Sequence, residues 1–166
     1  RHWNLEFDYW ERSATFRAEN GFEPRNDQRQ GNLATDYSFY FDEGLIDRIN
    51  PGLFAGRVWD MAGIKKDEWA GVSVWTRLRW AQTFLRFQHM QSNEQYYDIQ
   101  FDNIFLSEVN LQINPAEMIN GGLDYSYGHR IARQDLVMGR ETNFGGFVNI
   151  KPLSRFLWEN NFDYIR

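Results

Sequence analysis

The feature that most constrains this chain is an alternation of apolar and polar residues that continues along nearly its whole length. In RFLWENNFDYIR, residues 155–166, the positions Phe156, Trp158, Phe162 and Tyr164 share one parity, and the charged residues have the other. Successive side chains of a β-strand point to opposite faces, so such a run predicts a strand with one apolar and one polar face. Comparable runs are HWNLEFDYW, NLATDYSFYFD, LFAGRVWD, GVSVWTRLRW, TFLRFQH, YYDIQFD, FLSEVNLQI, GLDYSYGHR and ETNFGGFVNI.

These runs predict eight to ten strands, and no helical periodicity of comparable length competes with them. The parity changes between Trp80 and Thr83, which favours a tight turn at Ala81–Gln82 over a bulge, and the same two interpretations apply at Asn103. Residues 11–31 interrupt the alternation for longest and predict a long loop. Shorter connections, rich in turn-forming residues, are expected in DEGLIDRINPG, MAGIKKDE, QSNEQ, INPAEMINGG and KPLS.

The composition combines polarity with an unusual number of aromatic residues. Mean hydropathy is -0.65, yet 17% of the residues are aromatic, and the net charge is only -5 with no basic run. This charge does not indicate a nucleic-acid partner, and the absence of cysteine excludes a disulfide framework or a thiolate site. A polar chain with so many aromatics needs a geometry that separates the two classes, which alternating strands supply.

Two architectures use half-apolar antiparallel strands: a soluble sandwich and a transmembrane barrel. Charges in the middle of the polar faces, aromatics near strand ends and runs of about 9–13 residues favour the barrel. We therefore predict an all-β fold, an antiparallel up-and-down transmembrane β-barrel of about 8–10 strands, in which residues 1–166 form one barrel domain or barrel segment. The alternative is a soluble β-sheet carbohydrate-binding module whose exposed aromatics stack on sugars.

The alternation also predicts the partners of the two faces. The apolar face would contact membrane lipids, and the polar face would surround a watery lumen. Because Arg1 and Arg166 lie in or beside alternating runs, we expect the strands to belong to a larger barrel, completed by its remaining segments or by other outer-membrane proteins.

Seven charged residues are the predicted lumen or pore-lining residues of this barrel. Arg77, Arg79 and Arg86 have two interpretations. They favour anions in a pore, or they pair with Asp98, Asp102 and Glu108 on neighbouring strands. The second interpretation is preferred, because a narrow lumen needs its charges paired. The seven predicted residues are Arg77, Arg79, Arg86, Glu108, Asp124, Arg155 and Glu159.

No catalytic, metal or cofactor site is predicted. His2, His89 and His129 lack the spacing of metal ligands, and no nucleophile elbow, P-loop or dinucleotide motif occurs. Ser126 and His129 lie three residues apart and therefore on opposite faces of a strand. The expected function is that of a non-catalytic channel or surface scaffold for polar solutes.

The loop FRAENGFEPRNDQRQG and the segment INPAEMINGG, together with GRETNFGGFVNIKPLSRFLWENNFDY, resemble one family. It is the C-terminal barrel of outer-membrane proteins of unknown function that begin with a family-9 carbohydrate-binding-like module. Pro152 before the last hairpin also fits. The resemblance implies the outer membrane of a Gram-negative bacterium and no catalytic residues. The family's loop motif is matched by Phe16, Gly21, Phe22, Arg25 and Asp27.

Two arrangements of the long loop remain open. Gly21 permits a turn with positive φ and Pro24 fixes a bend, so Arg25 can reach Asp27 or Asp36 and hold the loop against the lumen or rim. The alternative is an exposed, mobile loop.

Overall fold

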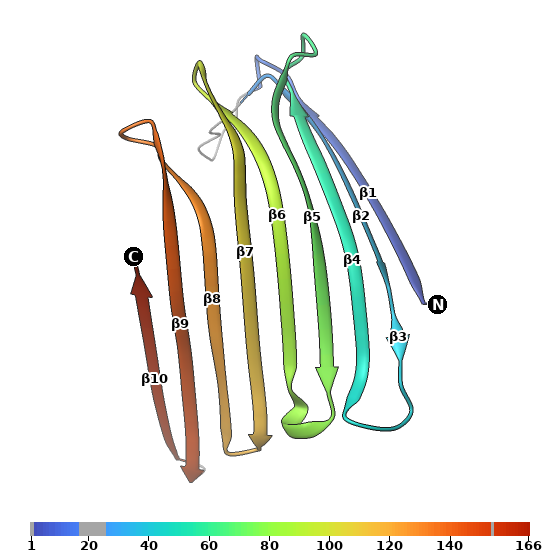
Figure 1. Ribbon diagram of the computed structural model, residues 1–166, viewed down its shortest axis with the longest axis vertical. Coiled ribbons are helices and arrows are strands. Elements are labelled where there is room, and N and C mark those ends of the chain that lie inside the picture. Colours follow the sequence, from blue (N-terminus) through green and yellow to red (C-terminus); the bar gives the residue numbers. More distant parts are fainter. Residues whose placement is uncertain (1, 17–25, 154) are drawn as a thin grey trace.

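The computed structural model describes residues 2–16, 26–153 and 155–166, which form a single antiparallel sheet (Figure 1). The one helical element among them is η1, a 3-10 turn at Trp80–Gln82. The all-β, up-and-down prediction is therefore confirmed. The strands are β1 (Trp3–Arg12), β2 (Gln28–Tyr37), β3 (Phe39–Tyr40), β4 (Ile46–Trp59), β5 (Lys65–Leu78), β6 (Phe84–Tyr96), β7 (Ile99–Ala116), β8 (Ile119–Ala132), β9 (Val137–Leu153) and β10 (Phe156–Ile165).

Strand order follows chain order, β1-β2-β4-β5-β6-β7-β8-β9-β10, and every neighbouring pair is antiparallel. The short β3 pairs with β4 in the register that β2 has already set. Pro51, inside β4, explains the break between β2 and β3: it has no N–H to donate, and it lies opposite Tyr37, which pairs with Trp3 on β1 but not with β4. The Ser38 N–H instead donates to the His2 carbonyl at 2.6 Å.

Several strands extend further than the alternation indicated, and the predicted connections shrink accordingly. QSNEQ lies inside β6, and the chain reverses at Tyr97–Asp98 instead, where Tyr97 has a positive φ of 54°. Most of INPAEMINGG belongs to β7 and β8, which leaves Glu117 and Met118 as the turn. Of the loop predicted at 11–31, both ends belong to strands instead, because β1 continues to Arg12 and β2 begins at Gln28. At these three sites, polar residues that usually form turns occupy positions within strands, so the predicted connections were too long.

The two changes of parity have different structural causes. At Ala81–Gln82 the predicted tight turn is present, and both residues have positive φ, 52° and 44°. At Asn103, whose φ is 56°, the strand continues through a bulge, because the pairing of β6 with β7 shifts between Ser92 and Glu94. The extra residue moves the odd positions of β7 to the other face: Phe101 pairs with Glu94 on the polar face, whereas Phe105 pairs with Gln91 on the apolar face.

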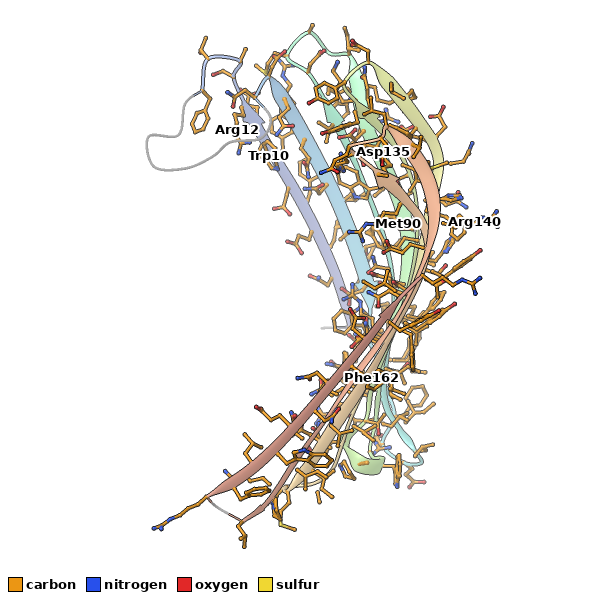
Figure 2. All side chains as sticks on the ribbon, turned by 90° about the vertical axis from the view of Figure 1, so that its left-hand side faces the viewer. Trp10, Arg12, Met90, Asp135, Arg140 and Phe162 are labelled. Atoms are coloured by element: carbon orange, nitrogen blue, oxygen red, sulfur yellow. The ribbon has the colours of Figure 1, made fainter. Side chains whose placement is uncertain are left out.

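The sheet is a curved wall with two chemically distinct faces. Seen from the side, β1 and β10 tilt in opposite senses, as the accumulated twist of a sheet requires, and Arg140 projects from the convex side while Met90 lies towards the concave side (Figure 2). Directly paired residues of antiparallel strands share a face. The register therefore assigns each residue to what we call the apolar face or the polar face.

Nothing among the described residues covers either face. Only three apolar side chains there are buried: Val58, Phe101 and Ile104. The accessible surface is 12122 Å², whereas a compact monomer of 19.9 kDa exposes about 8,700 Å². This sheet thus lacks the second layer that a water-soluble sandwich needs.

Glycines and aromatic rings are paired across neighbouring strands. Gly56 lies opposite Trp69, Gly71 opposite Phe54, and Gly122 opposite Phe147 on the polar face. On the apolar face, Gly146 lies opposite Phe162. In each pair the ring occupies the space of the missing Cβ: a methyl group there would come 2.2–2.7 Å from a ring carbon. Glycine thereby lets large rings lie flat against the sheet.

Candidate functional site

The apolar face forms a continuous band across all nine strands of the main path. Four or five alternate positions on most strands span about 20–26 Å along the strand at a rise of about 3.3 Å per residue, close to the apolar height of a membrane barrel, about 25 Å. No aspartate, glutamate, lysine or arginine occurs in the band. Its residues include Trp3, Leu5, Phe7, Leu33, Leu53, Val72, Val74, Phe87, Val109, Leu111, Leu123, Tyr125, Phe144, Val148, Trp158, Phe162 and Tyr164.

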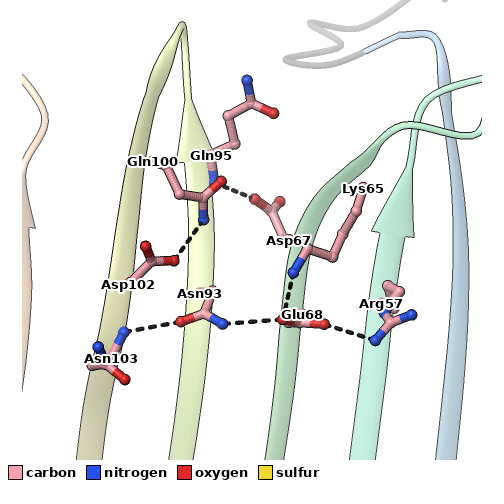
Figure 3. A network of polar contacts seen from close by, with 9 residues as sticks. All are labelled: Arg57, Lys65, Asp67, Glu68, Asn93, Gln95, Gln100, Asp102 and Asn103. Carbon is pink, nitrogen blue, oxygen red and sulfur yellow. Dashed lines mark hydrogen bonds and ion pairs between the residues drawn. The ribbon is translucent and has the colours of Figure 1, made fainter.

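A row of hydrogen-bonded polar groups marks the upper limit of this band (Figure 3). Glu68 on β5 accepts hydrogen bonds from Arg57 Nη2 at 2.8 Å, Lys65 Nζ at 2.6 Å and Asn93 Nδ2 at 3.0 Å. Asn93 Oδ1 in turn accepts from the Asn103 N–H at 2.9 Å. The row crosses four strands, β4 to β7, and its one carboxylate, Glu68, contacts both of its cations, Arg57 and Lys65. Sequence inspection missed it, because only the strand register brings these residues together.

A hollow of about 580 Å³ lies next to this row. It arises where Gly31, Ala55 and Ala70 provide little side-chain volume between the larger Phe7 and Trp59. Leu33, Ala55, Ala70 and Gln91 are consecutive cross-strand partners, so the hollow is a shallow place in the apolar face and has an apolar floor.

The polar face contains five of the seven predicted lumen residues, and one of these, Arg77, lies near the lower end of β5. Arg86 stacks on the Trp75 ring, 4.9 Å from its centroid, and donates to Gln88. Glu108 lies opposite Gln88 and Ser126. Asp124 accepts a hydrogen bond from Asn110 Nδ2 at 2.6 Å. Glu159 lies opposite Asn149 on β9. These residues share one face of the sheet, and Arg86 contacts Trp75 and Gln88 rather than a carboxylate on a neighbouring strand.

Arg77 and Arg79 occupy the lower end of the sheet and pair with a different carboxylate from those expected. Both approach Asp47, at 3.6 Å each, not Asp98, Asp102 or Glu108. Arg79 also donates to the carbonyls of Phe41, Gly44 and Ile46, so it ties the β3–β4 turn to the end of β5. Arg155 lies in the turn before β10. Arg79 and Arg155 therefore lie in the lower turns, and Arg77 lies at the lower end of the polar face.

The upper end of the polar face carries a second hollow, of about 1050 Å³. Its wall contains opposite charges in close contact: Arg133 Nη1 lies 2.6 Å from Glu94 Oε1, and Lys66 Nζ lies 3.5 Å from Asp60 Oδ2. The Ile64 N–H donates to Asp60 at 2.8 Å, and this bond, together with Lys66, lowers the pKa of the Asp60 carboxyl below its ordinary value. The hollow thus has a mixed, largely compensated charge.

Of the loop motif, Phe16 and Asp27 can be placed, whereas Gly21, Phe22 and Arg25 lie outside the described residues. Asp27 has a φ of 58° and accepts a hydrogen bond from the Met61 N–H at 3.2 Å. Asn26 Nδ2 donates to the Phe16 carbonyl at 2.7 Å. Asp27, the last residue of the motif, is thereby attached to the β4–β5 turn. Asp36, the other expected partner of Arg25, lies near the opposite end of β2 and pairs with Asn4.

One imidazole, that of His89, lies within the apolar band. Its Nδ1 is 2.8 Å from Ser107 Oγ on the neighbouring strand, and its ring stacks near Phe105. Within the described chain, no further side chain hydrogen-bonds to this ring, although a catalytic histidine needs an orienting group. The hydrogen bond satisfies two polar side chains on an otherwise apolar face.

Residues 2–16, 26–153 and 155–166 contain neither a cluster of metal-binding side chains nor a membrane-spanning helix. No group of three or more His, Asp or Glu residues there is placed to hold a metal ion, and no helix in this part of the chain is long and apolar enough to cross a membrane. Comparison with family models, curated proteins and solved structures finds no match to this chain.

Proposed function

We propose that this chain forms part of the wall of an outer-membrane β-barrel in a Gram-negative bacterium, a non-catalytic channel or surface scaffold for polar solutes. The observation that carries this proposal is the apolar band, which continues across nine strands without a charged side chain. In water such a surface favours aggregation. In a bilayer the same apolar surface contacts the hydrocarbon chains of the lipids.

The polar face completes the proposal. Arg86, Glu108, Asp124 and Glu159 lie on it with amide and hydroxyl neighbours, and such groups suit the water-filled interior of a barrel. Charge of both signs is spread over the face, so it favours polar solutes in general over ions of one sign. Because Gly56, Gly71 and Gly122 let the opposing aromatic rings lie flat on the polar face, these rings fill less of the proposed lumen.

Paired arginine substitutions on adjacent residues test which face meets lipid. An arginine near the bilayer midplane on the lipid face costs about 2–4 kcal/mol, whereas one on the lumen face stays hydrated. We expect Val74→Arg and Phe144→Arg to reduce insertion of the purified chain into phosphatidylcholine vesicles strongly. The matched neighbours Ser73→Arg and Asn143→Arg should insert like the parent chain.

Insertion is measured by protection from added protease and by quenching of tryptophan fluorescence with brominated lipid. Equal loss of insertion for the arginine variants on both faces would refute the assignment of the lipid-facing and lumen-facing sides. A monodisperse, β-rich chain purified without detergent that bound saturably on a glycan array would favour the soluble carbohydrate-binding alternative instead.

A further inference from the structure

One region of the polar face carries cations without carboxylates. Below the level at which Gly56 pairs with Trp69, the residues that β4, β5 and β6 place on this face include Arg48, Arg77 and Arg86 but neither aspartate nor glutamate. The mixed charge of the face as a whole is therefore locally unbalanced. Each of these three strands has described neighbours on both sides, so no additional strand can bring a carboxylate alongside the arginines.

Two of the arginines oppose each other. Arg48 and Arg77 are direct cross-strand partners, and like charges in that position destabilise pairing. Arg77 shares the single carboxylate of Asp47 with Arg79, at 3.6 Å each. Arg48 lies 5.9 Å from the centroid of the Tyr40 ring and has no carboxylate within ion-pair distance in the described part of the chain. One carboxylate thus faces three arginines, and their charge is only partly compensated.

The third arginine, Arg86, is held in place without a carboxylate. Its guanidinium lies 4.9 Å from the centroid of the Trp75 ring, and its Nη2 donates to Gln88. Its Nε is buried and has no hydrogen-bond partner among the residues that the structure describes. A guanidinium packed on an aromatic ring is already oriented, and its planar fork matches a carboxylate or a phosphate. Arg86 is therefore a preorganised cation without a counter-ion.

A hollow of about 410 Å³, which we call the arginine hollow, is lined by both Arg48 and Arg86. Its volume is in the range of small-molecule sites, about 300–1,000 Å³. Asp36 also lines it, but its backbone on β2 is about 13 Å or more from the backbone of either arginine. Neither Asp36 nor Glu108 on β7 comes within ion-pair distance of Arg48 or Arg86. Neutral hydrogen-bonding side chains complete the wall: Asn50, Ser73 and Gln88.

Resting on the channel function proposed above, we propose that the arginine hollow binds the acidic group of a small hydroxylated solute, a sugar acid or a sugar phosphate. The carboxylate or phosphate lies between Arg48 and Arg86 and accepts charge-assisted hydrogen bonds from them. The hydroxyl groups of the solute bind the neutral side chains of the wall. Because the hollow is on the proposed lumen face, a lipid head group does not reach it.

Calorimetric titration of the chain in an uncharged polyoxyethylene detergent tests this site. The probes are glucuronate, glucose 6-phosphate and glucose, which distinguish a carboxylate, a phosphate and no acidic group. We expect saturable binding of at least one acid and none of glucose. Arg48→Gln and Arg86→Gln should each weaken binding of that acid roughly tenfold, and Arg86→Lys, which keeps the charge without the fork, should weaken it less. Binding of neither acid, or equal binding of glucose, would overturn the proposal.

Arg130→Gln is the matched control. It removes the same charge from the upper end of the same face, where Arg130 is already paired with Glu141 at 3.0 Å. This variant should bind the acid like the parent chain, and a comparable loss of affinity would show that overall charge attracts the acid, which would overturn the site.

Urea unfolding separates loss of the site from a folding defect. The acid should raise the urea midpoint of the parent and of Arg130→Gln, because a ligand of the folded state stabilises it. It should not raise the midpoint of the double variant Arg48→Gln with Arg86→Gln. Without the acid, Arg48→Gln should not lower the midpoint, because it removes one of two opposed like charges. A midpoint of the double variant that rises as much as that of the parent would overturn the proposal.

Insertion into phosphatidylcholine vesicles is measured on the same preparation. A chain that binds the acid but does not insert contradicts the membrane-wall function, whereas a chain that inserts but binds neither acid contradicts only the arginine hollow.

Discussion

The pairing of Gly56 with Trp69 makes a quantitative prediction about stability. A Cβ at Gly56 would lie 2.2 Å from Trp69 Cζ2 and 2.4 Å from Cε2, whereas ordinary contact begins at 3.4 Å. The indole must therefore move by about 1.2 Å or leave the sheet surface. Overpacking of this kind costs about 1–3 kcal/mol, and we expect Gly56→Ala to destabilise the chain by that amount.

The assay is urea unfolding of the detergent-solubilised chain, followed by circular dichroism so that loss of a tryptophan does not alter the signal. Gly139→Ala is the matched control, since no atom lies within 4 Å of the added Cβ. This substitution should be neutral or stabilise by about 0.4–1 kcal/mol, because alanine restricts the unfolded chain more than glycine does.

A double-mutant cycle identifies the cause. In a Trp69→Ala background the added methyl group meets no indole, so most of the penalty of Gly56→Ala should disappear, with a coupling of about 0.5–3 kcal/mol. Asn32 Oδ1, 2.8 Å from the same Cβ position, is a flexible side-chain atom and can yield. If the penalty is unchanged without Trp69, or if Gly56→Ala matches Gly139→Ala, the packing argument is wrong.

Two further predictions concern polar groups at the end and in the middle of the sheet. The pKa of Asp60 is lowered, so its ionised form stabilises the fold above the ordinary aspartate pKa of 3.8, and this contribution is lost as the pH falls below that value. The difference in urea midpoint between the parent and Asp60→Asn should therefore shrink from neutral pH to about pH 3. A constant difference would contradict the stabilising role of the Asp60 carboxylate. His89 and Ser107 satisfy each other, so Ser107→Ala, which leaves the imidazole without its 2.8 Å partner, should cost about 1–3 kcal/mol. The double variant with His89→Leu should recover most of that loss, and failure to recover it would indicate another role for the histidine.

The alternation of residues was sufficient to predict the fold class and the faces of most strands. For the terminal run, Phe156, Trp158, Phe162 and Tyr164 do share the apolar face, since side-chain direction in a strand depends on parity alone. Strand ends were less predictable. Pro51 and Pro115 lie inside β4 and β7, although proline normally indicates a turn; Pro51 is accommodated because β2 is interrupted at the same level.

The contacts of individual site residues were not predictable in the same way. Arg77 and Arg79 meet Asp47 because the β3–β4 turn folds against the lower end of β5, and the alternation contains no information about that turn. The Glu68 row and the glycine–aromatic pairs depend on the register between strands, which a single sequence does not specify. A glycine on a strand does suggest close approach of a neighbour, but not which ring approaches.

Because every pairing joins strands that are consecutive along the main path, the sheet has consequences for how the chain folds. Each hairpin can form as soon as its own two strands are available, without waiting for a distant segment. Contacts of short sequence separation favour rapid folding, so the order of assembly can follow the order of synthesis or start from any hairpin. The break at Ser38, between β2 and β3, does not change this order of assembly, since β4 pairs with both strands in a single register. In the proposed barrel, only the closing seam would join remote strands, and the entropy of loop closure would be largest there.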